Sequence, residues 1–306
     1  MSTKVLYIAG SGRSGSTILD NILGELDGFV SAGEVRFLWE RGMQDDRTCA
    51  CGEPFSRCPF WGDVLTRAYG GRDAVAPARM IELLEQGTRA RRIPNMLGSS
   101  ARRHAFVAGL DELSYRLSAL YRAIADVSAA RVIVDSSKLP TYGLVLDQVP
   151  GVDLRVVHLI RDPRATAYSW RRKKSLPDTQ DVRLMQRQGP LKASGLWTLW
   201  NTAAGTFWRR TPERYLRLRY EDVIREPRAA IDRICAFMGE DVAGSPFVSD
   251  TEVQLTPSHS VAGNPSRFTT GHVTLRPDDE WQTKMRRTDR ALVTTVTWPL
   301  LLRAST

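Results

Sequence analysis

Short apolar runs divide the chain and predict buried β-strands. Three of them, KVLYIAG at 4–10, RVIVD at 131–135 and LRVVHLI at 154–160, are continuous and rich in β-branched residues. Such runs are typical of strands that are buried on both faces of a parallel sheet. A fourth run, RYLRLRYED at 214–222, alternates apolar and polar positions. We expect these four runs to form a central sheet.

Helical patterns follow the strand runs. Residues 17–26 have helical periodicity directly after a glycine-rich turn, and REPRAAIDRICAFMG at 225–239 has a proline near its start and a glycine at its end, which is typical of a complete helix. The apolar residues of 196–208 form one helical stripe, which indicates packing against a core. Strands that alternate with helices predict a three-layer α/β fold with a mainly parallel sheet.

The 306 residues are expected to form one domain, residues 1–306, with two irregular insertions. Residues 40–130 contain basic stretches, and residues 171–195 form a charged segment that prolines and glycines interrupt. We expect the first to be a helical acceptor-binding cap and the second to be a covering loop. Trp39, Trp61 and the arginines of 89–103 suit contact with a sugar or with an aromatic acceptor that carries an anionic group.

Charge narrows the classes of partner. Lysine and arginine number 43 against 34 acidic residues, giving a net charge of +9, which favours an anionic ligand. The basic residues are scattered and match no nucleic-acid-binding motif, so we expect a small polyanion and no nucleic acid. No apolar stretch is long enough to span a membrane, and the apolar run at the N-terminus is too short for a signal peptide. A cytoplasmic protein without membrane insertion is expected; the sequence does not indicate its oligomeric state.

Three of the four cysteines, Cys49, Cys51 and Cys58, lie close together. A disulfide framework is not expected in a reducing cytosol. A zinc site would need a fourth ligand, which this segment does not supply at the usual spacing. The pattern favours a cysteine-lined turn of the cap without a metal, with metal or redox chemistry as the alternative.

The stretch GSGRSGST at 10–17 is close to a Walker A phosphate loop but lacks its lysine. Its backbone N–H groups and the following helix N-terminus form an anion-binding site, to which the hydroxyls of Ser14, Ser16 and Thr17 add donors. Arg13 is the only cation of the loop. The cation of this loop therefore lies two residues before Gly15, whereas the lysine of a Walker A loop follows that glycine directly.

More charged and hydroxyl groups follow the other predicted strands. Lys138 comes after the 131–135 run, and Arg161 comes at the end of the 154–160 run, with Ser169 about two helical turns later. Because ligands of open α/β sheets bind outside the carboxyl ends of the strands, we expect these side chains to meet the phosphate loop. Arg161 and Ser169 can hold one phosphate from two sides.

These stretches together resemble the sulfotransferases that use 3′-phosphoadenosine 5′-phosphosulfate (PAPS), over most of the chain. GSGRSGSTIL resembles that family's 5′-phosphosulfate loop, in which a lysine or arginine two places before the glycine replaces the Walker lysine. LIRDPRATAYS resembles its 3′-phosphate motif, RYED resembles a stretch that contacts the adenosine, and HSVAGNPSRF resembles a bacterial closing segment. The resemblance implies a PAPS site that consists of Gly12, Arg13, Ser14, Gly15, Ser16, Thr17, Arg161, Ser169, Tyr220, Asn264 and Arg267.

The resemblance also implies a catalytic base. SAGEVRFLW resembles the Gly-Glu stretch of the tyrosylprotein branch, in which, as in some carbohydrate branches, a glutamate replaces the histidine base of the small-molecule members. Glu34 is then the base, and Arg13 and Lys138 neutralise charge on the leaving phosphate without a metal. His158 lies within a predicted buried strand and is interpreted as a core residue.

The activity implied is transfer of a sulfuryl group from PAPS to a hydroxyl, or an amine, of a small-molecule, glycan or lipid acceptor, with release of 3′-phosphoadenosine 5′-phosphate (PAP). Two other interpretations stay open. A P-loop kinase or nucleoside triphosphatase would need ATP, Mg²⁺ and a Walker B aspartate, a place that Asp135 can imitate. A non-catalytic polyanion-binding protein would bind PAP without turnover.

Overall fold

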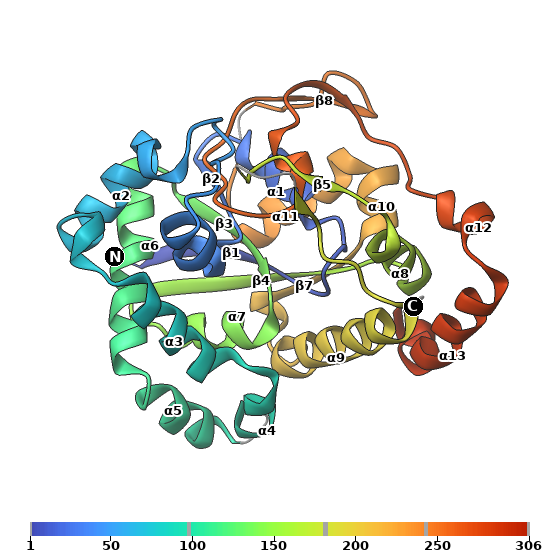
Figure 1. The fold of residues 1–306 in the computed structure, drawn as a ribbon, viewed down its shortest axis with the longest axis horizontal. Coiled ribbons are helices and arrows are strands. Elements are labelled where there is room, and N and C mark those ends of the chain that lie inside the picture. Colours follow the sequence, from blue (N-terminus) through green and yellow to red (C-terminus); the bar gives the residue numbers. More distant parts are fainter. Residues whose placement is uncertain (1, 97–98, 180–182, 242–243, 305–306) are drawn as a thin grey trace.

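A five-stranded parallel sheet forms the centre of the protein, with the strand order β2-β3-β1-β4-β7 (Figure 1). The structure, a computed structural model, describes residues 2–96, 99–179, 183–241 and 244–304. The four predicted runs form the strands β1 (Thr3–Ala9), β3 (Val132–Lys138), β4 (Val152–Ile160) and β7 (Tyr215–Arg219). The predicted α/β fold with a parallel sheet is therefore confirmed.

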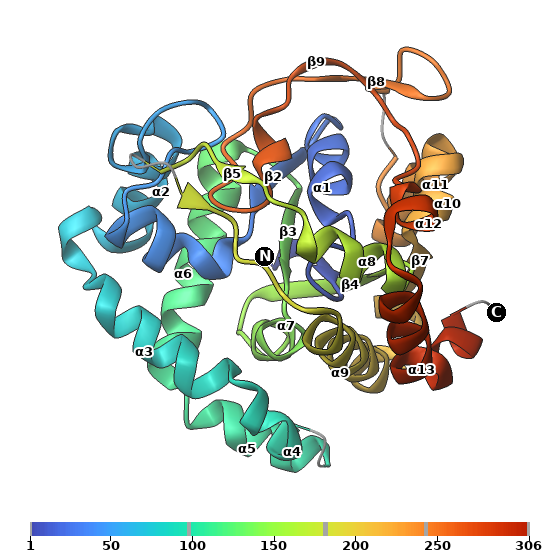
Figure 2. The same cartoon turned by 45° about the vertical axis from the view of Figure 1, so that its right-hand side comes forward.

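Alternating side chains of the central strand pack on the two faces of the sheet. Val5, Tyr7 and Ala9 of β1 belong to one buried cluster, and Leu6 and Ile8 belong to the other, as the period of two along a strand requires. Two views agree that α7 and α9 lie on the opposite side of the sheet from α1 (Figures 1 and 2). The first cluster includes residues of α2 (Pro59–Tyr69), α3 (Pro77–Thr88), α6 (Asp111–Ser128), α7 (Pro140–Leu146) and α9 (Pro190–Trp208). The second includes residues of α1 (Ser16–Gly24) and α11 (Pro227–Met238).

An edge strand, β2 (Phe29–Gly33), was not among the predicted strands. Its sequence FVSAG has two residues that favour strands, Phe29 and Val30, and then only small ones, so its apolar run is too short to stand out. Pairing with β3 stabilises it. Because Glu34 comes directly after this strand, β2 brings that carboxylate to the same edge of the sheet as the phosphate loop.

The cap region adds helices to the core. Besides α2, α3 and α6, it contains the π-helical segment Leu38–Gln44, α4 (Ile93–Met96) and α5 (Ser100–Ala108). The side chains of Trp39 and Trp61 are 1% and 0% exposed, so the expectation that they contact an acceptor is wrong. They are buried because they fill the space between the cap and the sheet. Arg89 pairs with Glu85 at the surface. Residues 97–98 and the side chain of Arg103 lie outside the described residues.

The second insertion and the C-terminal part complete the molecule. The insertion contains a small hairpin of β5 (Ser175–Leu176) and β6 (Arg183–Leu184), and residues 180–182 within it lie outside the described residues. The C-terminal elements and their neighbours are α8 (Pro163–Arg171), α10 (Tyr220–Arg225), β8 (Glu252–Leu255), β9 (Gly271–Thr274), α12 (Glu280–Lys284) and α13 (Arg287–Ala304). Within the described ranges, no helix has the length and apolar character that crossing a membrane requires.

Candidate active site

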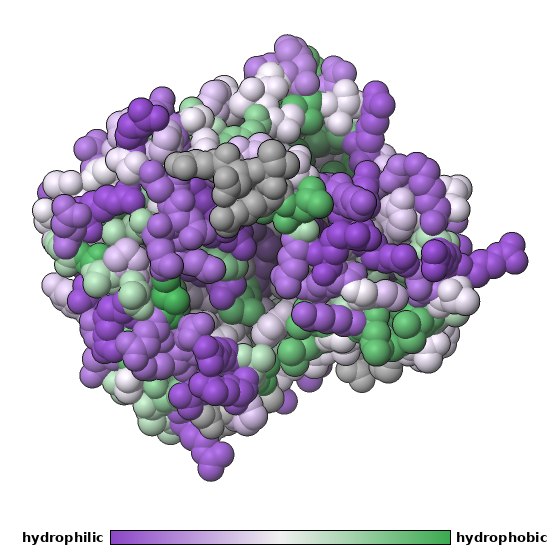
Figure 3. Space-filling view, viewed as in Figure 1, coloured by the Kyte–Doolittle hydropathy of each residue, from purple (hydrophilic) through white to green (hydrophobic). Residues whose placement is uncertain are grey.

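A cavity of about 460 Å³ lies at the carboxyl ends of the parallel strands, a size usual for small-molecule sites. In the space-filling view, this face of the molecule is hollowed near its middle, and both hydrophilic and hydrophobic residues border the hollow (Figure 3). Each strand contributes to the lining: Glu34 follows β2, Lys138 ends β3, Gly10 follows β1, Arg161 follows β4 and Tyr220 follows β7. The predicted residues that line it are Gly12, Arg13, Gly15, Ser16, Thr17, Glu34, Lys138, Arg161, Ser169, Tyr220 and Asn264.

The phosphate loop needs glycine at two positions because aromatic rings press against it. A Cβ atom on Gly12 would lie 2.7 Å from Cζ2 of Trp170, and one on Gly15 would lie 2.2 Å from the ring of Tyr220. Gly15 also has a φ of 90°, which most residues with side chains avoid. Helix α1 begins at Ser16, so its first N–H groups face the cavity together with its positive dipole end.

Arg13 is held by contacts with neighbouring side chains, and one of its donor atoms has no partner among the described residues. Its guanidinium lies over the ring of Trp170, 4.8 Å from the centroid, and Nη2 lies 3.3 Å from Sδ of Met185. Its Nη1 is buried and has no hydrogen-bond partner within the described residues. Burial lowers the pKa of Arg13, yet an arginine stays protonated. A charged donor that is buried without a partner is costly, and an anionic ligand would satisfy it. The hydroxyl of Ser14 is also buried, but Ser14 does not line the cavity.

Glu34 and Lys138, which both line the cavity, form an ion pair. Nζ of Lys138 lies 2.6 Å from Oε1 of Glu34 and donates to the carbonyl of Ser136 at 2.9 Å. A register shift at the end of β3 and a φ of 67° at Lys138 turn the lysine toward the site; irregularities of this kind often re-aim side chains near active sites. Burial alone would raise the pKa of Glu34, but the Lys138 ammonium, followed by the Arg41 guanidinium, holds it below its ordinary value.

Arg161 is positioned by contacts on several sides. Nη2 lies 2.9 Å from Oδ2 of Asp278, Nη1 donates to the carbonyl of Arg13 at 3.2 Å, and the guanidinium lies 4.5 Å from the ring centroid of Tyr220. Its Nε is buried without a partner among the described residues. Ser169, which is 5% exposed, lines the same cavity from α8. The expected pair for one phosphate is thus brought to one cavity, with Asp278 already bound to the arginine.

Arg267 lies outside the cavity. The residue is 2% exposed, and its Nη2 donates to the carbonyl of Thr48 at 2.7 Å and lies 3.1 Å from Oδ2 of Asp178. The guanidinium therefore joins the C-terminal segment to both insertions instead of facing the ligand space. Asn264 does line the cavity, while its Oδ1 accepts from the N–H of Ser266 at 3.2 Å and caps the short helix Pro265–Phe268.

Half of the basic side chains that line the cavity were not predicted from the sequence. Six basic side chains line the cavity against two carboxylates, Glu34 and Asp278, so the site attracts anions. The cations not predicted are Arg36, Arg41 and Lys174. Burial, and then the charges of neighbouring arginines, lower the pKa of Lys174. Arg36 was detectable because it lies two residues after Glu34, whereas only the fold brings Lys174 to the site. Aromatic lining that was also missed comes from Phe37, Trp170 and Trp200.

Two side chains serve the core instead of the cavity. Asp135 is fully buried and accepts from the N–H and hydroxyl of Ser137 at 2.8 and 2.5 Å and from the hydroxyl of Tyr121. It does not line the cavity, so the structure gives a Walker B role no support. His158 is also buried. Its ring bonds the hydroxyl of Tyr215 at 2.6 Å and Oδ1 of Asn201 at 2.9 Å, and burial lowers its pKa to about 4. The core interpretation of His158 is confirmed.

Comparisons with known proteins agree with this arrangement. A sequence model described as the sulfotransferase family matches residues 6–244. Among curated proteins, no sequence matches the chain. The sulfotransferase domain of the Synechococcus PCC 7002 olefin synthase has a TM-score of 0.55 at 21% identity, over 96% of this chain and 94% of that one. The sulfotransferase domain from the curacin biosynthetic pathway has a TM-score of 0.53 at 17% identity, over 97% of each chain. These two likenesses concern the fold.

Proposed function

Because the chain belongs to the sulfotransferase family, whose members use PAPS, we propose that the cavity at the strand ends binds PAPS. We further propose that the acceptor is a hydroxyl, or an amine, of a small molecule, glycan or lipid, and that PAP is the second product. One observation supports this most strongly. The loop after β1 has a half-buried arginine as its cation, and the same cavity holds the ion pair of Glu34 and Lys138.

The residues present fit a nucleotide with phosphates at two positions. Among the buried donors without partners in the described structure, two belong to arginines of the cavity, Nη1 of Arg13 in the phosphate loop and Nε of Arg161 at the end of β4. Both arginines line the cavity, as does the N-terminus of α1. Anionic groups at both places would satisfy donors that are costly to bury alone.

Each part of the cavity then has a distinct binding role. The backbone N–H groups of the loop, with Arg13, Ser16 and Thr17, would hold the 5′-phosphosulfate. Arg161 and Ser169 would hold the 3′-phosphate through charge-assisted hydrogen bonds. The ring of Tyr220 would contact the adenosine, and Asn264 would contribute from the closing segment. Arg267 belongs to the supporting structure in this proposal, since it is already paired with Asp178.

PAPS, when bound, supplies an activated sulfuryl group whose transfer leaves negative charge on the 5′-phosphate. Lys138 and Arg13 supply positive charge at the site, and charges that the fold holds in place stabilise developing charge well. Glu34 accepts the proton of the acceptor hydroxyl at a carboxylate oxygen. Because the pKa of Glu34 is lowered, this carboxylate is ionised at neutral pH and ready to accept a proton.

The ion pair links donor binding to the strength of the base. The ammonium of Lys138 lowers the pKa of Glu34 while the two are paired. An anion in the phosphate loop would compete for the same ammonium. Weakening of the ion pair would raise the pKa of Glu34, so its carboxylate would hold the proton of the acceptor more tightly. The carboxylate would therefore become a stronger base when the donor is present.

A labelling experiment tests this proposal. Radiolabelled PAPS is incubated with the protein and a broad set of hydroxyl- and amine-bearing small molecules, glycans and lipids. We expect a labelled product with the wild-type protein and with Glu85→Gln, a control at an exposed glutamate of α3. We expect none, or very little, with Glu34→Gln. Equal labelling by Glu34→Gln would remove Glu34 from the mechanism, and no product across the whole acceptor set would count against the proposed acceptor classes.

A further inference from the structure

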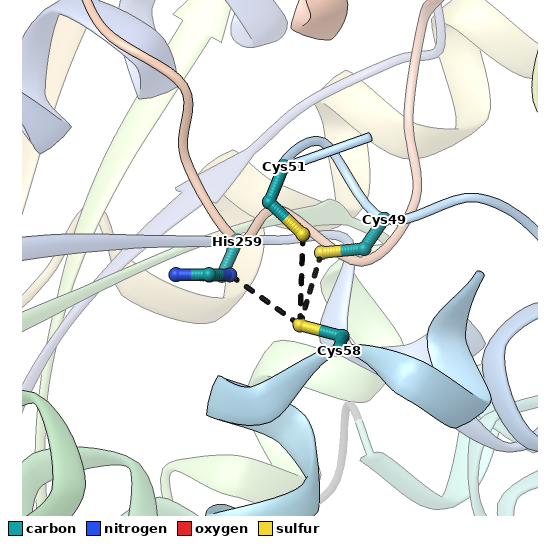
Figure 4. Close-up of side chains that lie close together, drawn as sticks. All are labelled: Cys49, Cys51, Cys58 and His259. Atoms are coloured by element: carbon teal, nitrogen blue, oxygen red, sulfur yellow. Dashed lines mark hydrogen bonds between the residues drawn. The ribbon is translucent and has the colours of Figure 1, made fainter. Parts of the chain in front are cut away.

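Three cysteines and a histidine that are far apart in the sequence converge outside the proposed active site. Cys49 and Cys51 lie on one turn of the cap, Cys58 precedes helix α2, and His259 lies on the segment that follows β8 (Figure 4). One ligand atom from each of the four residues lies within 4.8 Å of every other. The fourth ligand that the cysteine segment lacks is therefore supplied by a residue about two hundred positions later.

The distances fit a tetrahedral metal. Sγ of Cys58 lies 3.6 Å from Sγ of Cys49, 3.8 Å from Sγ of Cys51 and 3.4 Å from Nδ1 of His259. In a tetrahedron around Zn²⁺, bonds of about 2.3 Å to sulfur and 2.0–2.1 Å to nitrogen place two sulfurs about 3.8 Å apart and sulfur about 3.5 Å from nitrogen. The three distances from Cys58 agree with these values, so only small shifts of the other ligand atoms are required.

We propose that Cys49, Cys51, Cys58 and His259 bind a structural Zn²⁺. Three thiolates and an imidazole are ligands that zinc prefers, and four protein ligands complete its tetrahedral coordination. Cys49 and Cys58 are buried, and the other two residues are half-buried. None of the four lines the active-site cavity. A closed set of four ligands leaves no position for a substrate, so the metal has a structural role.

Surrounding contacts hold the ligands in place. The ring of Phe60 stacks on the imidazole of His259, with centroids 4.8 Å apart and an interplanar angle of 13°. Nε1 of Trp61 donates to the carbonyl of His259 at 2.7 Å. The N–H of Cys49 donates to the carbonyl of Glu53 at 2.8 Å, which shapes the turn that carries two of the thiols. Contacts that orient ligands in this way are usual around metal sites.

The metal would secure the segment that closes the active site. From His259 the chain continues through Ser260, whose carbonyl accepts from the N–H of Ala50 at 3.2 Å, and Ala262, whose carbonyl accepts from the N–H of Glu34 at 3.3 Å. The next two residues of this segment, 263 and 264, line the cavity. Zinc would therefore tie the cap to the segment that bonds the backbone of the proposed base.

A disulfide is the main competing explanation for close thiols. It requires sulfur atoms about 2.05 Å apart, whereas Sγ of Cys58 lies 3.6 Å from Sγ of Cys49 and 3.8 Å from Sγ of Cys51, and all three thiols are free. A disulfide would also use two thiols and leave the third cysteine and His259 without a purpose at this position. The two explanations differ in metal content and in the number of free thiols, which can both be measured.

Metal analysis of the 306-residue chain, purified without a polyhistidine tag or chelators, tests the proposal. We expect one zinc per chain in the wild type and in Cys235→Ser, a control at the cysteine of α11 that is not part of the group. We expect Cys58→Ser and His259→Ala to lose most of the zinc. Wild-type protein without zinc, or equal zinc in Cys58→Ser and Cys235→Ser, would overturn the proposal.

A second measurement covers the case in which these variants do not fold. Wild-type protein produced with Co²⁺ in place of zinc should show thiolate-to-metal charge-transfer absorption and the intense visible bands of tetrahedral cobalt. Absence of these bands, or a disulfide among the three cysteines in the unreduced denatured protein, would overturn the proposal. Neither readout depends on PAPS or on turnover, so failure here is distinct from failure of the proposed sulfuryl transfer.

Discussion

The Nζ atom of Lys138 lies 2.6 Å from Oε1 of Glu34, so the proposed cation and the proposed base form one ion pair, in which Glu34 is buried and Lys138 is half-buried. The pair spans the ends of β3 and the neighbouring edge strand β2. It depends on the irregular end of β3, where Lys138 has a φ of 67°. Each charge stabilises the other, so removing either one changes the ionisation of the site as well as its contacts.

Glu34→Gln should lower turnover by about 10² to 10⁴, the usual contribution of a general base. Glutamine keeps the size of the side chain but cannot accept the proton, so the affinity for PAP should change little. Steady-state rates with a substrate from the labelling screen and calorimetric titration with PAP give the two quantities. Turnover equal to that of Glu85→Gln, the exposed control, would exclude Glu34 as the base.

Lys138→Ala should lower turnover, and it should also shift the pH profile. The lysine lowers the pKa of Glu34, so its removal raises that pKa. The base is then protonated at a higher pH, and the acidic limb of the kcat profile should move to higher pH. Lys284→Ala, at an exposed lysine of α12, is the control. An acidic limb that stays in place would show that Lys138 does not set the ionisation of the base.

Arg161→Ala should weaken PAP binding by about 1.5 to 3 kcal/mol, the usual value for a hydrogen bond to a charged group. This corresponds to a roughly 10- to 150-fold higher Kd. Arg225→Ala, at an exposed arginine of α10, should bind normally. The loss should vanish for adenosine 5′-phosphate, which lacks the 3′-phosphate. An equal loss for both nucleotides would place Arg161 elsewhere in the site.

Arg267→Ala should act on stability. Its charge partner Asp178 is equally buried, and an unpaired buried charge costs about 3 to 5 kcal/mol in the free energy of unfolding. Chemical denaturation should show this loss, and the double variant Arg267→Met with Asp178→Leu should recover much of it. Normal stability together with lost PAP binding in Arg267→Ala would instead support the 3′-phosphate role that the family resemblance implies.

The sequence predicted the parts of the site that continuous motifs encode. Four strands and the loop around Arg13 were predictable because apolar runs and glycine spacing are local signals. His259 could not be assigned to Cys58 because only the folded chain brings them together. The expectation that Trp61 contacts an acceptor was wrong because a tryptophan suits an acceptor site as well as a core. Only its burial in the folded chain decides between the two. The ion pair of Arg267 likewise depends on tertiary packing.

The most direct test of the account is calorimetric titration with PAP and with ATP, each in the presence and in the absence of added Mg²⁺. Chelators are left out so that the proposed zinc is not disturbed. The phosphate loop with Arg13, and the second anion site at Arg161, predict tight binding of PAP that does not depend on Mg²⁺. Binding of ATP only with Mg²⁺, and none of PAP, would contradict the roles given to Arg13, Glu34 and Lys138.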